Sequence, residues 1–327
     1  MKNIILTLDY ELFFGEKSGS VEKCMLEPID LLIELFYKHN CKMTIFWDVL
    51  HYIRAKELNI DHEVKKIEKS IKKLIEFGHD VQLHIHSHWI DAKYLNGQWI
   101  FPTYEHYRLQ SLNENEIFNI VAISKKTIES LTKRKVYAFR AGGWQIEPFK
   151  KLKEAWLKNG IFVDSSVASG KKYDGKIVKF DFRDYPKEKV YRFSDTPKIK
   201  DEDGKFTEYQ IETIKVPNYI IFYSYLRKII FKTNFSALGD SKGADSGNGN
   251  KFNRYLLPLK RALMGAYDML SLEFTSEIVF EYMINQCSEN AVMIGHPKSI
   301  GYEHIEILDK LLSEKKIRFL SLKEVVR

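Results

Sequence analysis

Short apolar runs alternate with longer amphipathic segments through the first half of the sequence. The runs have the length and β-branched content of buried strands, and they fall at 3–9, 42–48, 79–86, 136–140 and 161–166. The segments between them have the periodicity of helices, at 27–40, 63–78, 113–135 and 147–160. Strands that alternate with helices of ten or more residues form βα units and a parallel sheet. The alternation resumes at 290–322, so we expect a single α/β barrel domain over 1–327.

The alternation is interrupted between about 170 and 260. Short charged segments at 170–217 are typical of antiparallel hairpins, the aromatic segment 218–231 predicts an apolar helix, and the Gly/Ser/Asp-rich stretch 237–251 predicts a loop. We expect these residues to form a late insertion of β-hairpins and helix in the barrel. The insertion either forms a wall of a substrate site or is an appended subdomain or dimer contact.

Charge and cysteine content argue against several classes of protein. The formal net charge is +7, and the lysines of 63–78 follow the spacing of a solvated helix face, which is not the pattern of a nucleic-acid groove. The first apolar run is too short for a signal peptide or a membrane span. The three cysteines are widely spaced and form no CxxC pair. We expect a cytoplasmic protein with no nucleic-acid partner, no membrane span and no disulfide framework.

Three of the ten histidines occupy alternate positions, in the sequence HIHSH at 84–88. His84 and His88 share a face whether the segment is a strand or a helix, because two steps of period 2 and one helical turn both separate residues four apart. Neutral imidazole is a common ligand of zinc. A lone histidine in an apolar strand is usually structural, so a metal site requires further ligands near His84 and His88.

Other chemically active side chains also follow predicted strands. Asp9 and Glu11 end the first strand and share a face because they are two residues apart. Arg140, Asp164 and His296 end three later strands. The carboxyl ends of parallel strands meet at one face of a barrel, where ligands bind. Carboxylates, imidazoles and an arginine at successive strand ends are the inventory of a metallohydrolase.

With these residues in this order, the sequence resembles the polysaccharide deacetylases, the NodB-homology enzymes of carbohydrate esterase family 4. TLDYE stands where the family has TFDD, HIHSH where it has HxxSH, and RAGGW where it has an arginine before a Pro/Gly turn; VDSS and GHP correspond to the fourth and last motifs. The resemblance covers residues 7–297 and implies a distorted (β/α)7 barrel. The chain departs from the family in the one-residue displacement of Glu11 and in the turn that follows Arg140.

The resemblance implies a bound divalent metal ion, with zinc expected first and cobalt or nickel as alternatives. We assign Glu11, His84 and His88 as its ligands, because a catalytic zinc site uses three protein ligands and keeps open positions. His86 then either bonds to a neighbouring strand or supports the ligands from outside.

The remaining motifs imply roles in proton transfer. Asp9 is the expected base and Arg140 its orienting partner, while His296 is the expected general acid. A backbone N–H near Gly143 is expected to face the oxyanion. Asp164, in the fourth motif, is included among the catalytic residues.

The function that follows is removal of an N-acetyl group from an amino sugar of a bacterial surface polysaccharide or its precursor. Trp47, Trp89 and Trp144 lie at strand-end motifs, where they either stack on the sugar or cap the core. Two alternatives stay open: an amidohydrolase acting on a small non-glycan amide, and a carbohydrate-binding protein without turnover. The sequence leaves the sugar and the oligomeric state open.

Overall fold

The computed structural model describes residues 1–231, 235–243, 261 and 263–326. Its main sheet has the order β10-β11-β7-β6-β3-β2-β1-β14, with β15 also paired to β1. The strands from the predicted βα alternation are β1 Lys2–Tyr10, β2 Thr44–Asp48, β3 Asp80–Ile85, β6 Ala138–Ala141, β7 Val163–Asp164, β14 Ala291–Gly295 and β15 Ile317–Leu320. All of these pair in parallel, which confirms the predicted α/β class.

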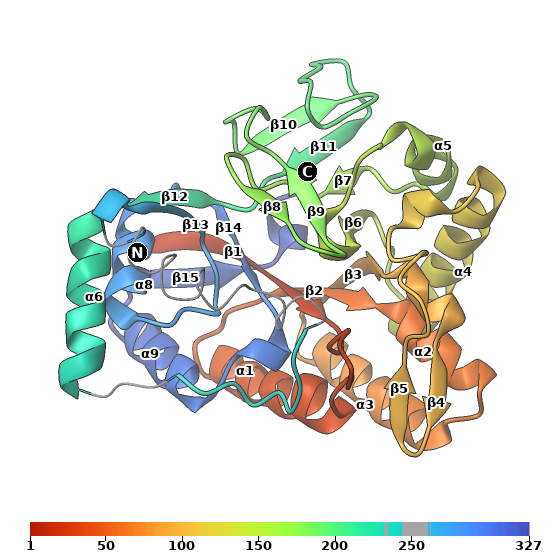
Figure 1. Ribbon diagram of the computed structural model, residues 1–327, viewed down its shortest axis with the longest axis horizontal. Helices are drawn as coiled ribbons and strands as arrows, with labels where there is room; N and C mark the ends of the chain where they lie inside the picture. The colour runs from red at the N-terminus through yellow and green to blue at the C-terminus, as the bar shows by residue number, and fades with distance from the viewer. Residues whose placement is uncertain (232–234, 244–260, 262, 327) are drawn as a thin grey trace.

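Helices connect these strands and cover the outside of the curled sheet (Figure 1). They are α1 Glu27–Lys38, α2 Val49–Glu57, α3 Asp61–Glu76, α4 Glu114–Thr132, α5 Lys150–Asn159, α8 Glu277–Gln286 and α9 Tyr302–Ser313. In α3, Val64, Ile67 and Leu74 are buried, whereas Lys65 and Lys69 are exposed, as the helical spacing predicts. Burial of such apolar faces against the sheet, rather than helix propensity, supplies most of the stability of these helices.

The sheet curls far enough to bring its two sides together. Ile211, just after β11, forms an isolated parallel bridge with Val292 of β14. The Ile211 N–H also donates to the Val167 carbonyl at 2.8 Å, and the Glu212 N–H donates to the Val292 carbonyl at 2.9 Å. The architecture is therefore a distorted (β/α) barrel. The central strands are buried on both faces, so β2 reads as a largely apolar run, whereas β3 alternates apolar residues with the buried Asp80, Gln82 and His84.

The expected insertion does contain antiparallel hairpins, but part of it belongs to the main sheet. Strands β8 Lys172–Asp174 and β9 Lys179–Asp181 form a separate hairpin. Strand β10 Val190–Phe193 pairs antiparallel with β11 Phe206–Tyr209, and β11 pairs in parallel with β7. The predicted aromatic helix is present as α6 Asn218–Phe231. Strands β12 Thr213–Val216 and β13 Ala266–Met269 form a further antiparallel pair beside it.

Two features of the fold were missed by the sequence analysis. Helix α2 follows β2 with no turn residue between them. The small hairpin of β4 Lys93–Leu95 and β5 Gln98–Ile100 turns at Asn96 and Gly97, which both have positive φ. Of the predicted Gly/Ser/Asp-rich loop, residues 244–251 lie outside the described residues. Residues 235–243 are described, and the Gly239 N–H donates to the Lys298 carbonyl.

Candidate metal centre and active site

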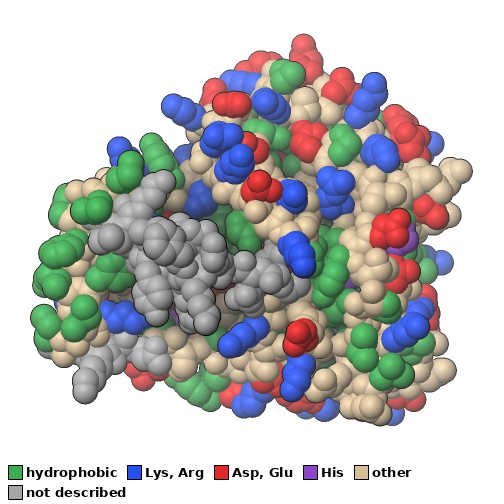
Figure 2. Space-filling model, in the orientation of Figure 1, with side chains coloured by type: hydrophobic (Ala, Val, Ile, Leu, Met, Phe, Trp, Pro, Cys, Tyr) green, Lys and Arg blue, Asp and Glu red, His purple; other side chains and the backbone are tan. Residues whose placement is uncertain are grey.

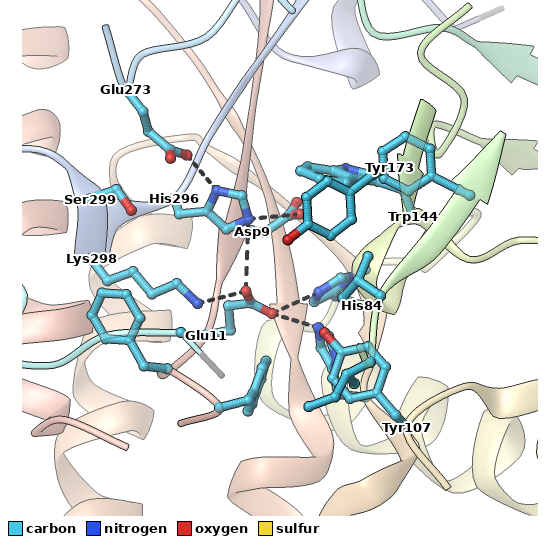
Figure 3. Close-up of a pocket in the computed structure, with 18 of the residues that line it drawn as sticks. Asp9, Glu11, His84, Tyr107, Trp144, Tyr173, Glu273, His296, Lys298 and Ser299 are labelled. Carbon is cyan, nitrogen blue, oxygen red and sulfur yellow. Dashed lines mark hydrogen bonds and ion pairs between the residues drawn. The ribbon is translucent and has the colours of Figure 1, made fainter. Parts of the chain in front are cut away.

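A pocket of about 440 Å³ opens at the carboxyl ends of the central strands. Asp9 and Glu11 from β1 and its end, His84 and His86 from β3 and its end, and His296 after β14 all line it. Figure 3 shows His84 and Lys298 approaching the carboxylate of Glu11 from opposite sides, with His296 above it. Of the strand-end residues predicted from the sequence, Asp9, Glu11, His84 and His296 therefore line one cavity, whereas His88, Arg140 and Asp164 are not in its lining.

Glu11, His84 and His86 form a compact group at the base of this pocket. The Oε2 atom of Glu11 lies 2.9 Å from His84 Nε2 and 2.8 Å from His86 Nε2. All three side chains are buried, and one ligand atom from each lies within 4.8 Å of the others. Burial opposes ionisation of Glu11, but Lys298 and the two imidazoles outweigh it and keep the pKa of Glu11 well below its usual range.

The tautomer of His84 is fixed by a carbonyl. His84 Nδ1 lies 2.8 Å from the Arg140 carbonyl oxygen, which can only accept, so Nδ1 carries a hydrogen. Burial disfavours the charged ring, but the carboxylates of Asp9 and Glu11 outweigh burial and raise the pKa of His84 to about 9. The contact between Nε2 and the carboxylate of Glu11 therefore holds a proton, whose place a divalent cation would take. Two imidazole nitrogens and one carboxylate oxygen match the donor set of catalytic zinc sites. Glu11, His84 and His86 therefore fit a divalent metal ion.

His88, which the sequence analysis assigned as the third ligand, is not part of this group. His86 takes its place. Strand β3 ends at Ile85 and His86 is still extended, so residues 84 and 86 keep the strand period and share a face. The 3-10 turn Ser87–Asp91 then directs His88 elsewhere. The His88 ring packs against Phe14 and stacks on Tyr107, and neither ring nitrogen has a hydrogen-bond partner among the described residues.

Asp9 and Arg140 form a buried ion pair beside the group. The Arg140 Nη1 donates to Asp9 Oδ1 at 2.8 Å. Other donors of the same guanidinium bond to Thr7 Oγ1 at 2.8 Å and to the Ser165 carbonyl at 2.6 Å. Arg140 is thus fixed between β1 and β7, and it holds one oxygen of Asp9 while Oδ2 faces His296 Nε2 at 3.5 Å. The predicted pairing of Arg140 with Asp9 agrees with this geometry.

His296 lies on the opposite side of the pocket from His84. Its Nδ1 pairs with Glu273, and its Nε2 lies 3.7 Å from Glu11 Oε1. Burial disfavours the charged ring, but the carboxylate of Glu273 outweighs burial and raises the pKa of His296. A protonated His296 with Nε2 directed into the pocket is a suitable proton donor.

Comparisons with known proteins concern the fold alone. No family model and no curated protein sequence matches the chain. Among solved structures, 4-alpha-glucanotransferase from Thermococcus litoralis matches with a TM-score of 0.52 and 12% identity, over 99% of this chain and 40% of that one. This likeness supports the barrel architecture.

Deacetylases are also among the similar structures, at lower scores. A family 4 carbohydrate esterase from Streptomyces lividans matches at 9% identity and a TM-score of 0.42, covering 97% of this chain and 91% of its own. A polysaccharide deacetylase from Bacillus cereus matches at 11% identity and a TM-score of 0.43, covering 100% and 95%. At these values the function has to be argued from the site.

Only one of the three tryptophans expected to contact substrate lines the pocket. Trp144 does, with its ring edge toward Phe180 and His296. Trp47 and Trp89 are fully buried, and Trp89 Nε1 donates to Asp48 at 2.6 Å. Trp47 and Trp89 therefore offer no surface for a sugar, because both faces of β2 and the turn after β3 are covered by the core.

Replacement of Trp47 by alanine should affect mainly stability, whereas replacement of Trp144 should affect mainly substrate binding. Trp47→Ala should lower the free energy of unfolding by ~3–5 kcal/mol, because it empties a filled core site. Trp144→Ala should leave stability nearly unchanged and raise KM for the substrate. Urea unfolding and steady-state kinetics of both variants check this. A raised KM for Trp47→Ala without loss of stability would contradict the core assignment.

The two glycines after β6 have distinct structural reasons. A Cβ on Gly142 would lie 2.6 Å from the Ile85 carbonyl oxygen and 2.8 Å from His86 Nδ1, so a side chain at 142 would displace His86. Gly143 has φ of +59° and lines the pocket, where its N–H is the candidate oxyanion donor. The glycine pair in RAGGW was a signal for His86 that sequence reasoning missed.

Gly142→Ala should therefore displace the His86 ring and weaken metal binding by at least ~10-fold. Loss of a residue that supports a metal ligand typically lowers metal affinity by ~10–100-fold, and displacement of His86 should lower it by at least the smaller of these factors. Gly243→Ala is a matched control, because Gly243 also lines the pocket but a Cβ there has no atom of the described residues within 4 Å. Chelator competition with both purified variants measures the effect. Equal affinities would show that His86 does not depend on the space beside Gly142.

Asp164 does not line the pocket, in contrast to its expected place among the catalytic residues. It pairs in register with Glu208 of β11, and both side chains are buried. Asp164 Oδ2 and Glu208 Oε2 have no hydrogen-bond partner among the described residues. Burial raises the pKa of Asp164 to about 7. Burial and, after it, the nearby carboxylate of Asp164 raise the pKa of Glu208 well above its usual value. The geometry gives Asp164 a structural role.

A raised folded-state pKa makes stability fall as the pH rises. Asp164 titrates near 4 when unfolded, so its protonated form stabilises the fold fully below that pH, and this contribution is lost as the pH rises through about 7. Asp164→Asn should flatten the decrease in unfolding free energy between pH 4 and about 7. Urea titrations across this range test it, and an unchanged slope would contradict a protonated pair.

Lys298 and Glu273 were also missed. Lys298 Nζ donates to Glu11 Oε1 and to the Leu12 carbonyl, both at 2.7 Å. It therefore holds the oxygen of Glu11 that faces away from the two histidines. Neither Lys298 nor Glu273 lies in a motif that marks it. Lys298 directly follows the GHP sequence, and Glu273 lies 23 residues before His296 in the chain.

Proposed function

We propose that this protein is a metal-dependent deacetylase that removes the N-acetyl group from an amino sugar of a bacterial surface polysaccharide or its precursor. The observation that carries the proposal is the buried group of Glu11, His84 and His86 next to the Asp9–Arg140 pair, in one cavity with His296. Zinc is the preferred ion because of the N,N,O donor set, with cobalt or nickel as alternatives. A cytoplasmic location stays a prediction.

The chemistry divides among the pocket residues. A divalent metal held by Glu11, His84 and His86 would polarise the amide carbonyl and acidify a water molecule. Asp9, oriented by Arg140, accepts the proton of the attacking water. His296, whose raised pKa favours its protonated form, donates a proton to the departing amine. The N–H of Gly143 is the donor proposed for the oxyanion.

The walls of the pocket suit a sugar ring with an acetyl group. Trp144, Tyr107 and Tyr173 line it and Figure 3 shows Trp144 and Tyr173 above His84. Aromatic faces stack on the apolar faces of sugars, and a cavity of about 440 Å³ lies in the ordinary range for small-molecule sites. The size favours a substrate that presents one or a few sugar units to the site.

Acetate release by the zinc-loaded protein tests the proposal. N-acetylglucosamine oligomers of increasing length are compared with a small N-acetyl amide that contains no sugar. We expect release from the sugars alone, and loss of release in Asp9→Asn. Faster hydrolysis of the small amide would assign the protein to the amidohydrolases. Binding of the oligomers without release, at full metal occupancy, would indicate a carbohydrate-binding protein.

A further inference from the structure

Helix α6 is apolar on both its inward and its outward face. Its inward face includes Ile221 and Ser224, which are buried against the neighbouring α8. Ile229 and Ile230 on the outward face are 74% and 68% exposed. The outward apolar side chains of α6, with those just before and on β13, form what we call the α6 surface: Tyr219, Phe222, Tyr223, Leu226, Ile229, Ile230, Leu263, Met264 and Tyr267.

The α6 surface is a continuous feature of one edge of the molecule. Figure 2 shows hydrophobic side chains gathered at the left edge, where α6 stands in Figure 1. The same chain builds an ordinary solvated helix in α3, whose outward positions are Lys65, Lys66, Lys69 and Lys72. Contiguous exposed apolar surface of this kind marks an interaction site, whereas scattered apolar residues do not.

The charged side chains carried by α6 are basic. The sequence contains no Asp or Glu from 213 to 231, whereas Lys215, Arg227 and Lys228 lie in this span. Glu277 of α8 lines a small cavity together with Arg227 and Lys228. The neighbouring carboxylate of Asp268 is paired with Arg261. Basic residues beside an apolar helix face, with tyrosines at its margin, match the chemistry of an anionic bilayer surface.

A second copy of the chain is a poorer fit to this surface. A two-fold dimer places the same patch of each subunit against the other. The cations of α6 would then face each other across the interface, and α6 itself carries no carboxylate to offset them. Among the described helices, none is long and apolar enough to cross a membrane.

We propose that the α6 surface docks this protein on the surface of an anionic membrane, with α6 lying parallel to the bilayer and its apolar side chains inserted among the headgroups. The surface is directly connected to the pocket. Lys171, which lines the pocket, donates from Nζ to the Tyr267 carbonyl at 2.7 Å, and Met269 of β13 also lines it. Docking would therefore hold the pocket at a fixed position relative to the lipid surface, whatever substrate the pocket takes.

Co-sedimentation with lipid vesicles tests the docking. The full chain should bind vesicles of phosphatidylcholine and phosphatidylglycerol, and bind phosphatidylcholine alone much more weakly. The double variant Ile229→Glu/Ile230→Glu should bind at least ~10-fold more weakly. The free energy gained by burying one isoleucine side chain is larger than the free energy that corresponds to a tenfold change in affinity. Lys228→Glu should weaken binding at low salt but not at high salt, where screening removes its contribution.

Ile199→Glu is the matched control, since Ile199 is 65% exposed but lies between β10 and β11, far from α6 in the fold. It should bind vesicles like the unchanged protein, and all variants should keep the same circular dichroism melting curve and metal content. Failure of the unchanged protein to bind anionic vesicles, or equal binding by the double variant, overturns the proposal. A dimer that the double variant converts to a monomer, without vesicle binding, assigns the surface to a second copy instead. None of these outcomes depends on deacetylase activity.

Discussion

Asp9→Asn is expected to lower kcat by ~10²–10⁴-fold, the usual contribution of a general base, while the metal content stays unchanged. The reason lies in the placement of the two carboxylates at the end of β1. Glu11 faces both imidazoles, whereas Asp9 bonds to Arg140 and faces His296. Asparagine keeps the size and the contact with Arg140 but cannot accept the proton of water.

Metal analysis and acetate release have to be measured on the same preparation of Asp9→Asn. Retained metal with lost turnover agrees with a base. Loss of the metal would show that Asp9 is a ligand, and the roles of Asp9 and Glu11 would then have to be exchanged. Arg140→Lys is a useful companion, because it keeps the charge but cannot make the same set of bonds to Asp9, Thr7 and Ser165.

His86→Ala is expected to weaken metal binding by more than ~100-fold and to abolish activity with it, since loss even of a supporting outer residue costs ~10–100-fold. The matched control is His88→Phe. The His88 ring lies among Phe14, Phe101 and Tyr107, and its nitrogens have no hydrogen-bond partner in the part of the chain that the structure describes. Burial also keeps the pKa of His88 well below its usual value. Phenylalanine therefore suits this apolar site, and His88→Phe should keep metal, activity and stability.

Chelator titration of the two histidine variants distinguishes the two possible ligand sets. Retained metal in His86→Ala together with lost metal in His88→Phe would restore the assignment of His88 from the family motif. The comparison is decisive because both histidines are buried and only two residues apart.

The sequence was sufficient for the parts of the fold that depend on hydrophobic periodicity. Strands β1 and β2 are largely apolar runs, β3 alternates apolar and polar residues, and α3 has one apolar stripe, so length and spacing identify them. The pairing of β11 with β7 was beyond reach, because a short strand with alternating burial does not indicate whether its partner is parallel, antiparallel or distant.

The site shows the same limit at a smaller scale. Asp9, Glu11, His84 and His296 meet in the pocket, with Arg140 bonded to Asp9, because parallel strands end at one face, which topology alone predicts. The choice between His86 and His88 depends on the residue at which β3 changes to a 3-10 turn, and boundaries are the least certain part of a sequence-based prediction. The role of Trp47 stayed open between sugar contact and core packing because the sequence does not reveal how fully the end of a strand is covered.

Anomalous diffraction from crystals of the zinc-loaded protein tests the central claim most directly. We expect one peak in the pocket, within ~2.0–2.2 Å of a Glu11 oxygen and of His84 Nε2 and His86 Nε2, the usual bond lengths of zinc to carboxylate and imidazole. Asp9 should lie beside the ion without binding it, still paired with Arg140. A peak held by His84 and His88 with Glu11 turned away, or no zinc in the pocket at saturating concentration, would contradict the account.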